Sequence, residues 1–231
     1  EGIAHEGVNS TKLGLKGIPA LAEELQVARD LFLLEYTGGK LHIPTISTAK
    51  SVALIKDAKK KGLDVSCSVA VHHLILTDDE LHEFDSNFKT NPPLRTNADC
   101  KALIKGIKSG VIDVITSDHN PIDIEHKKVE FSEAKDGTIG LESLFGAVNS
   151  ILTIEEFIEN ITSKPRTIFG LKTTAIAEGE IADISLFNPD QTYTFTKKHI
   201  LSISKNSPFI NTKLNGKVYG IFSNKQLILN F

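Results

Sequence analysis

Three polar clusters sit where predicted strands end, and their side chains are of the types best suited to chemistry. They are the pair His72-His73, the sequence Asn-Pro-Pro-Leu-Arg at residues 91–95, and the sequence Ser-Asp-His-Asn-Pro at residues 117–121. Imidazole and carboxylate groups are suitable ligands for zinc and similar ions. We therefore hypothesise that His73 and Asp118 share a metal centre. Asp118 could also carry a proton there if the ion tunes its pKa.

Each of these residues also has an ordinary structural interpretation. His73 could be a core histidine whose ring nitrogens bond to the backbone, and Asp118 could cap a helix or a turn. The two residues lie far apart in the sequence and form no local motif, so their spacing leaves both interpretations open. The position of three clusters at strand ends favours a functional site, because functional groups collect at the C-terminal ends of strands in α/β barrels.

Apolar patterning predicts the elements that position these clusters. The predicted strands are residues 41–46, 63–71 and 111–116. The predicted helices are residues 19–36, 48–61, 97–110, 141–152 and one that opens at the capping box of Thr153 and Glu156. In the first helix, Leu21, Leu25, Ala28 and Phe32 share one face. Strands alternating with helices predict βα units around a parallel sheet, and so an α/β fold.

The last part of the chain has a different pattern. Residues 182–187, 217–222 and 226–231 resemble strands, and no helical pattern separates the last two. Residues 223–225 suit a hairpin turn between them. We therefore predict a boundary near Leu171, with residues 1–171 in one domain and residues 172–231 in a small β domain.

Composition narrows the class of protein. A formal net charge of −3 argues against a nucleic-acid partner, and no apolar stretch approaches the roughly 20 residues that a membrane helix needs. Cys67 and Cys100 have neither a metal-binding nor a redox spacing, which favours a reducing compartment, and we expect the cytoplasm. The chain starts at Glu1 and has no methionine, so we expect it to be part of a longer protein.

Several segments, taken in order, resemble the dihydroorotases of the amidohydrolase superfamily, in particular the type found in multifunctional pyrimidine-synthesis complexes. The resemblance runs from about His5 to Phe231. It is carried by residues 9–15 (NSTKLGL), 41–49 (LHIPTISTA), 72–74 (HHL), 91–95 (NPPLR), 114–119 (VITSDH), 140–142 (GLE), 168–171 (IFGL) and 182–189 (ADISLFNP).

The resemblance implies a (β/α)8 TIM-type barrel with a small β-sandwich domain, of which this chain holds the later half of the barrel and the C-terminal strands. It implies reversible interconversion of dihydroorotate and N-carbamoyl-aspartate by a metal-activated hydroxide. One or two zinc ions are then expected, with His73 and Asp118 as ligands and the remaining ligands upstream of Glu1. Asp118 would shuttle the proton, and Asn91 would contact the small-molecule substrate. We also expect a homo-oligomer.

Two positions depart from the family pattern. Thr45 stands where the family has a second metal-binding histidine, and a threonine hydroxyl is a poor zinc ligand. His42 cannot replace that histidine, because an odd shift along a strand turns a side chain to the opposite face. Ile122 stands where a histidine helps to hold the substrate carboxylate, and isoleucine cannot form that hydrogen bond. The alternative is therefore a non-catalytic dihydroorotase-like scaffold subunit associated with aspartate transcarbamoylase.

Overall fold

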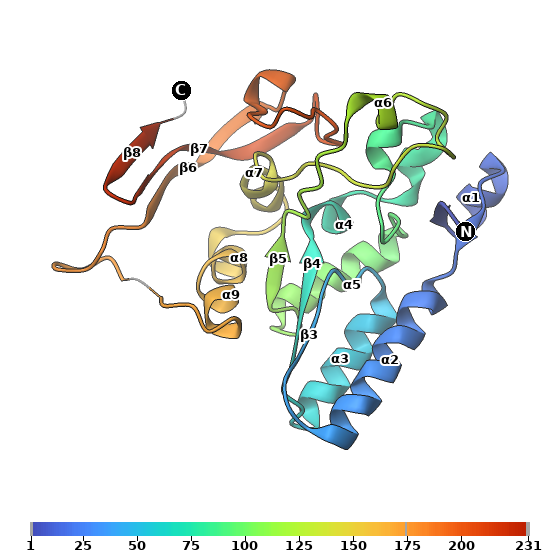
Figure 1. The fold of residues 1–231 in the computed structure, drawn as a ribbon, viewed down its shortest axis with the longest axis horizontal. Coiled ribbons are helices and arrows are strands. Elements are labelled where there is room, and N and C mark those ends of the chain that lie inside the picture. Colours follow the sequence, from blue (N-terminus) through green and yellow to red (C-terminus); the bar gives the residue numbers. More distant parts are fainter. Residues whose placement is uncertain (1, 174, 230–231) are drawn as a thin grey trace.

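A parallel sheet forms the centre of the computed structural model, which describes residues 2–173 and 175–229 (Figure 1). Its strands β3 (Leu41–Ile43), β4 (Val65–Ala70) and β5 (Val114–Thr116) are hydrogen-bonded in the order β3-β4-β5. Ile43 pairs with Cys67, and Ala70 pairs with Thr116. Because all three strands run in the same direction, their C-terminal ends meet at one edge of the sheet. The predicted parallel α/β arrangement is confirmed.

Three helices pack beside this sheet: α2 (Ala20–Thr37), α3 (Ala49–Lys60) and α5 (Asn97–Lys108). The helix α3 packs against both α2 and α5. Its predicted inner residues, Val52, Ile55 and Ala58, are buried. They join a core that includes Cys67 and Val69 of β4, both with no exposed surface. Successive side chains of a strand point to opposite faces of the sheet. Burial of one set against the helices therefore places the next set on the other face.

The face of helix α2 that is buried in the core differs from the face that its sequence pattern predicts. The structure buries Val27, Leu31 and Leu34. Leu21, Leu25 and Phe32, which share the patterned face, are 56, 60 and 70% exposed. Two apolar stripes run along this helix, and packing against α3 covers only one of them. The periodicity predicted the helix correctly but could not select the stripe that is buried.

The other elements are short and surround this centre. They are β1 (Ala4–His5), β2 (Gly17–Ile18), α1 (Val8–Leu13), α4 (Val71–Ile75), α6 (Ile124–Lys127), α7 (Leu144–Asn149), α8 (Ile154–Ile161), α9 (Ser163–Ile168), and three 3-10 turns at Asp78–Glu83, Ser86–Phe88 and Lys197–His199. The predicted capping box of Thr153 and Glu156 opens α8, and Phe157 of that helix is fully buried.

The C-terminal strands form an antiparallel sheet in the order β6-β7-β8. They are β6 (Ile184–Thr194), β7 (Lys213–Ser223) and β8 (Gln226–Leu229). Asn224 and Lys225 have φ of 50° and 62°, as the two-residue turn of a hairpin requires, and Ser223 pairs with Gln226. The predicted hairpin is confirmed, while residues 230 and 231 of the predicted strand lie outside the described residues. Within residues 175–229 these three strands form one sheet, so the sandwich stays a prediction.

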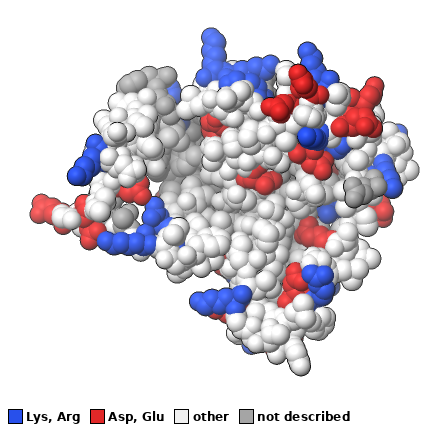
Figure 2. Space-filling model, in the orientation of Figure 1, with Lys and Arg blue, Asp and Glu red and all other residues white. Residues whose placement is uncertain are grey.

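Charged side chains of both signs gather toward the edges of the face shown in Figure 2, and its middle is largely uncharged. No continuous basic surface crosses this face, in keeping with the formal net charge of −3. In the part of the chain that the structure describes, no helix combines the length and the apolar character needed to cross a membrane.

Candidate active site

The shared edge of the parallel sheet brings together residues from three separate segments. The chain leaves β3 toward Thr45, leaves β4 into the first turn of α4 with His72 and His73, and leaves β5 toward Asp118. Both histidines are 1% exposed. Asp118 has a φ of 45°, in the left-handed region, and its backbone N–H donates to Thr116 Oγ1 at 3.2 Å. The predicted clusters at 72–73 and 117–121 therefore do follow strands, whereas the prediction was wrong for the cluster at 91–95, which follows the 3-10 turn at Ser86–Phe88.

His72 is the histidine beside Asp118. Its Nε2 lies 3.9 Å from Asp118 Oδ2, and neither of its ring nitrogens has a hydrogen-bond partner within the described residues. Burial lowers the pKa of His72 well below its usual value, and the nearby His73 lowers it further. Burial also raises the pKa of Asp118. A neutral imidazole next to a partly desolvated carboxylate can bind a cation or exchange a proton.

His73 points instead toward the segment that holds Asn91. Its Nε2 donates to Pro92 O at 3.0 Å, since a carbonyl can only accept. Thr90 Oγ1 donates to the same oxygen at 2.8 Å. Burial lowers the pKa of His73 to about 4, which keeps the ring neutral. The structure thus brings His72, rather than the predicted His73, within 4 Å of Asp118.

The predicted substrate residue Asn91 has an exposed side chain at the edge of this site. Its position depends on His73, because the His73 ring bonds to the neighbouring residue of the chain. The sequence signal for His72 was present in the His-His pair. Adjacent residues of a helix point about 100° apart, however, so the sequence could not say which of the two faces Asp118.

A buried arginine ties the Asn91 segment to the loop that follows β3. Arg95 is 2% exposed, and its Nε donates to Ser47 Oγ at 3.0 Å. Its Nη1 donates to Ile18 O at 3.0 Å and lies 3.1 Å from His5 Nδ1. Its Nη2 lies 3.8 Å from Glu23 Oε2. Arg95 therefore links four segments that are distant in the sequence.

Glu23 completes this network from the first turn of α2. Its Oε1 accepts from the backbone N–H groups of Ser47 and Thr48, at 2.9 and 3.2 Å. The Ser51 hydroxyl donates to the same carboxylate oxygen at 2.7 Å. Because Glu23 satisfies these donors, the loop between β3 and α3 is held rigidly behind Thr45.

Thr45 has an unusual backbone conformation. Its φ is 48°, and its N–H donates to Ser68 Oγ at 3.0 Å. A β-branched residue in the left-handed region is strained, and such strain concentrates at functional sites. His42, three residues earlier, is occupied elsewhere: its Nδ1 lies 2.8 Å from Ser66 Oγ and its ring packs against Phe169. His42 therefore does not take the place of the missing histidine at 45.

The donor set fits part of a zinc site. His72 offers unpartnered ring nitrogens, and Asp118 offers a carboxylate oxygen 3.9 Å away, a separation compatible with two ligands of one ion. Zinc sites usually have three or four protein ligands. Within residues 2–173 and 175–229, no group of three or more His, Cys, Asp or Glu side chains is arranged to hold a metal ion. The described residues alone therefore supply an incomplete site.

Ile122, the second departure, lines a cavity of about 800 Å³ beside this edge of the molecule. Lys128, Lys197 and Asp123 also line it, so its wall carries both signs of charge. The backbone N–H of Ile122 donates to Asn206 Oδ1 at 3.3 Å. The side chain of Ile122 can contribute apolar contact to this cavity but no hydrogen bond.

The fold is a parallel α/β arrangement with polar side chains beyond its strand ends, and comparison with known proteins identifies the family. The amidohydrolase family model matches residues 9–227, and the chain belongs to that family. The family and the solved structures that superpose on the chain imply a TIM-barrel-type α/β fold. The familial resemblance seen in the sequence is confirmed.

Particular relatives carry the name dihydroorotase. The chain is 40% identical to the dihydroorotase of Trichlorobacter lovleyi over 94% of the chain and 52% of that protein. It is 39% identical to the dihydroorotase of Acetivibrio thermocellus over 99% of the chain and 55% of that protein. The chain thus spans about half the length of the curated relatives it matches.

Solved structures share the fold. The L-hydantoinase of Arthrobacter aurescens superposes with a TM-score of 0.86 and 25% identity, over 93% of this chain and 50% of that one. The inactive dihydroorotase-like domain of a Chaetomium thermophilum CAD-like multifunctional protein superposes with a TM-score of 0.64 and 21% identity, over 87% of this chain and 54% of that one. At 21% identity the second likeness concerns the fold alone.

Proposed function

We propose that the protein is a dihydroorotase-type cyclic amide hydrolase that interconverts dihydroorotate and N-carbamoyl-aspartate in pyrimidine biosynthesis. The observation that carries the proposal is the approach of His72 and Asp118 at the ends of parallel strands, in a chain about 40% identical to proteins named dihydroorotase. Hydantoinases, which share the fold, act on other cyclic amides and are less similar in sequence.

Zinc, when bound, would activate water and polarise the carbonyl of the cyclic amide. Asp118 and an imidazole of the His72–His73 pair would hold it. The geometry favours His72, because Pro92 O already engages Nε2 of His73 and leaves that ring only Nδ1. The remaining ligands are expected before Glu1. These ligands are compatible with a site of one zinc ion or of two.

Asp118 would carry the proton. Its carboxylate would take a proton from the attacking water and give it to the ring nitrogen as the amide C–N bond breaks. In the reverse direction the same carboxylate would take the proton back. Asn91 would bind the substrate from the rim, where its exposed side chain adjoins His73 through Pro92.

The architecture of the whole protein belongs to the same proposal. We infer a (β/α)8 barrel completed by other parts of the polypeptide, a domain boundary near Leu171, and a sandwich to which β6–β8 contribute. A homo-oligomer in the cytoplasm is the expected state.

The test is turnover by the full-length protein. Purified protein should hydrolyse dihydroorotate, cyclise N-carbamoyl-aspartate and contain zinc by elemental analysis, and D118N should abolish both reactions. The dihydroorotase of Trichlorobacter lovleyi is the positive control. Folded, zinc-loaded protein without turnover in either direction would overturn the proposal. Stable binding to aspartate transcarbamoylase by such a protein would then support the scaffold alternative.

A further inference from the structure

The side chain of Asn206 joins the loop that follows Asp118 to a second segment around Gly137. Its Nδ2 donates to Asn120 O at 3.0 Å and to Gly137 O at 3.2 Å. Its Oδ1 accepts from the N–H of Ile122 at 3.3 Å. With 5% of its surface exposed, Asn206 makes these bonds out of water, where a lost partner is costly.

The backbone of Asn206 strengthens the same junction. Its carbonyl accepts from the Thr138 hydroxyl at 2.8 Å and from the N–H of Ile139 at 3.1 Å. The N–H of Asn120 in turn donates to Thr138 O at 2.8 Å. Residues 120–122 and 137–139 are therefore held to one another and to residue 206.

Two further contacts close this unit. His119 Nδ1 accepts from the N–H groups of Gly140 and Leu141, both at 3.3 Å. Glu142 Oε1 accepts from the N–H groups of Leu201 and Ser202, at 3.0 and 2.8 Å. The loop after β5 is thus fixed at both ends to the segment before β7.

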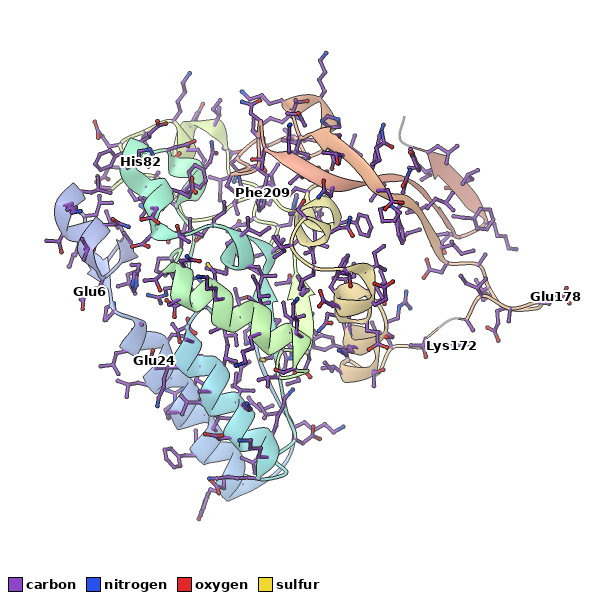
Figure 3. The ribbon with its side chains drawn as sticks, turned by 180° about the vertical axis from the view of Figure 1, so that it is seen from behind. Glu6, Glu24, His82, Lys172, Glu178 and Phe209 are labelled. Atoms are coloured by element: carbon purple, nitrogen blue, oxygen red, sulfur yellow. The ribbon has the colours of Figure 1, made fainter. Side chains whose placement is uncertain are left out.

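The Asn206 segment is itself anchored in the main core. Phe209, three residues later, is 1% exposed and belongs to the same hydrophobic cluster as the strands. Figure 3 shows Phe209 where the segment leading to β7 meets the body of the molecule. The core therefore holds Asn206 as a fixed point, and the hydrogen bonds of Asn206 can hold the loop after Asp118 in place.

Asp118 lies between two such fixed points. On one side is β5, which ends at Thr116, and on the other is Asn120, whose carbonyl bonds to Asn206. Asp118 has its left-handed φ of 45° between them, with its carboxylate 3.9 Å from His72. Aspartate enters the left-handed region more readily than most residues, and here the bond from its N–H to Thr116 Oγ1 and the two fixed points define its position.

We propose that Asn206 is a positioning residue for Asp118: it holds the loop that keeps the Asp118 carboxylate directed at His72. The C-terminal segment thus contributes to catalysis without touching the reacting atoms. This inference rests on the proposed function, in which Asp118 carries the proton. It adds a residue from outside the predicted barrel segment, since position 206 follows the predicted boundary near Leu171.

The test compares N206A with N160A in the full-length protein. Asn160 is a matched control: it is 1% exposed, and its Nδ2 donates to two carbonyls, Ile112 O and Asp113 O, both at 3.0 Å. These carbonyls precede β5, at the opposite end from Asp118. N206A should lower kcat and kcat/KM together, by roughly 100-fold, as a misplaced catalytic group does. N160A should keep the wild-type kcat. Equal kcat in N206A and wild type, or an equal loss in N160A, would overturn the proposal.

A second variant covers the case in which N206A does not fold. Thr138→Val deletes the hydroxyl that donates to Asn206 O and keeps the side-chain shape. It should lower kcat by about tenfold, the lower end for loss of a supporting contact. A folded T138V protein with unchanged kcat would refute the positioning role.

A measurement without turnover separates this inference from the proposed function. The ¹⁵N resonances of the His72 ring, assigned through His72→Gln, should shift at fixed pH in N206A and stay in place in N160A. Unchanged His72 resonances in N206A would refute the positioning role even in an active enzyme. A wild-type protein that turns over neither substrate would instead refute the proposed function, and shifted resonances would still support the role of Asn206.

Discussion

His72 Nε2 lies 3.9 Å from Asp118 Oδ2, although the two residues follow different strands of the sheet. The parallel pairing of β4 with β5 creates this proximity, because Ala70 lies beside Thr116 and each site residue comes two positions later. The neighbouring His73 is turned away and bonds to Pro92 O. The two adjacent histidines therefore make different contacts, and the first prediction follows from this difference.

Replacing each histidine with glutamine should give different defects in the full-length protein. H72Q should weaken zinc binding by at least roughly 10- to 100-fold, because it removes the imidazole beside Asp118. This range is typical for the loss of a residue that supports a metal ligand, and the loss of a ligand should cost no less. H73Q should chiefly raise KM, because it loosens the segment that carries Asn91. Competition against a zinc chelator and steady-state kinetics measure the two effects. The opposite pattern, with zinc lost in H73Q and kept in H72Q, would restore His73 as the ligand.

Thr45→His should strengthen metal binding. The substitution adds an imidazole at the same edge as His72 and Asp118, and histidine accepts a left-handed φ more readily than threonine. Zinc affinity of the full-length variant should exceed that of the wild type, as measured by the same competition. Thr45→Gly is the control, since it relieves the backbone strain, on the order of 1 kcal/mol, without adding a ligand. Equal affinity in T45H and T45G would contradict the prediction.

The metal-free protein should lose stability as the pH falls below about 6.5. The pKa of His73 is lowered to about 4 by burial, so the unfolded state binds its proton first. Stability is therefore complete above the unfolded pKa and is lost as the pH falls from about 6.5 toward 4. The loss from His73 amounts to ~3 kcal/mol, and His72 acts in the same direction.

Urea unfolding in the presence of a chelator, repeated across this pH range, measures the effect. The H73Q variant should show a shallower pH dependence than the wild type. An identical slope in both proteins would show that His73 is protonated without cost in the folded state.

Arg95→Met should destabilise the fold strongly. The substitution leaves the Glu23 carboxylate, whose side chain is 13% exposed, without its buried guanidinium partner. Removing one partner of a buried pair costs about 3–5 kcal/mol. Arg29→Met is the control, because the side chain of Arg29 is 61% exposed in its pair with Asp30 and such pairs contribute little. Similar melting temperatures for the two variants would contradict the buried network.

Several features of this protein could be predicted from the sequence because they are encoded locally. The helix α3 with its inward Val52, Ile55 and Ala58, the capping box at Thr153, and the hairpin at Asn224 and Lys225 all depend on residues a few positions apart. The apolar runs of β3, β4 and β5 likewise predicted a parallel sheet and placed Asp118 and the His72–His73 pair at its edge.

Tertiary packing decided the remaining features. It selected the buried stripe of α2, turned His72 rather than His73 toward Asp118, and brought Asn206 to the loop that follows Asp118. The local sequence shows which faces of a helix or strand are apolar. The neighbours that cover such a face come from distant parts of the chain. The direction of each side chain at the site is therefore set by contacts that no short stretch of sequence contains.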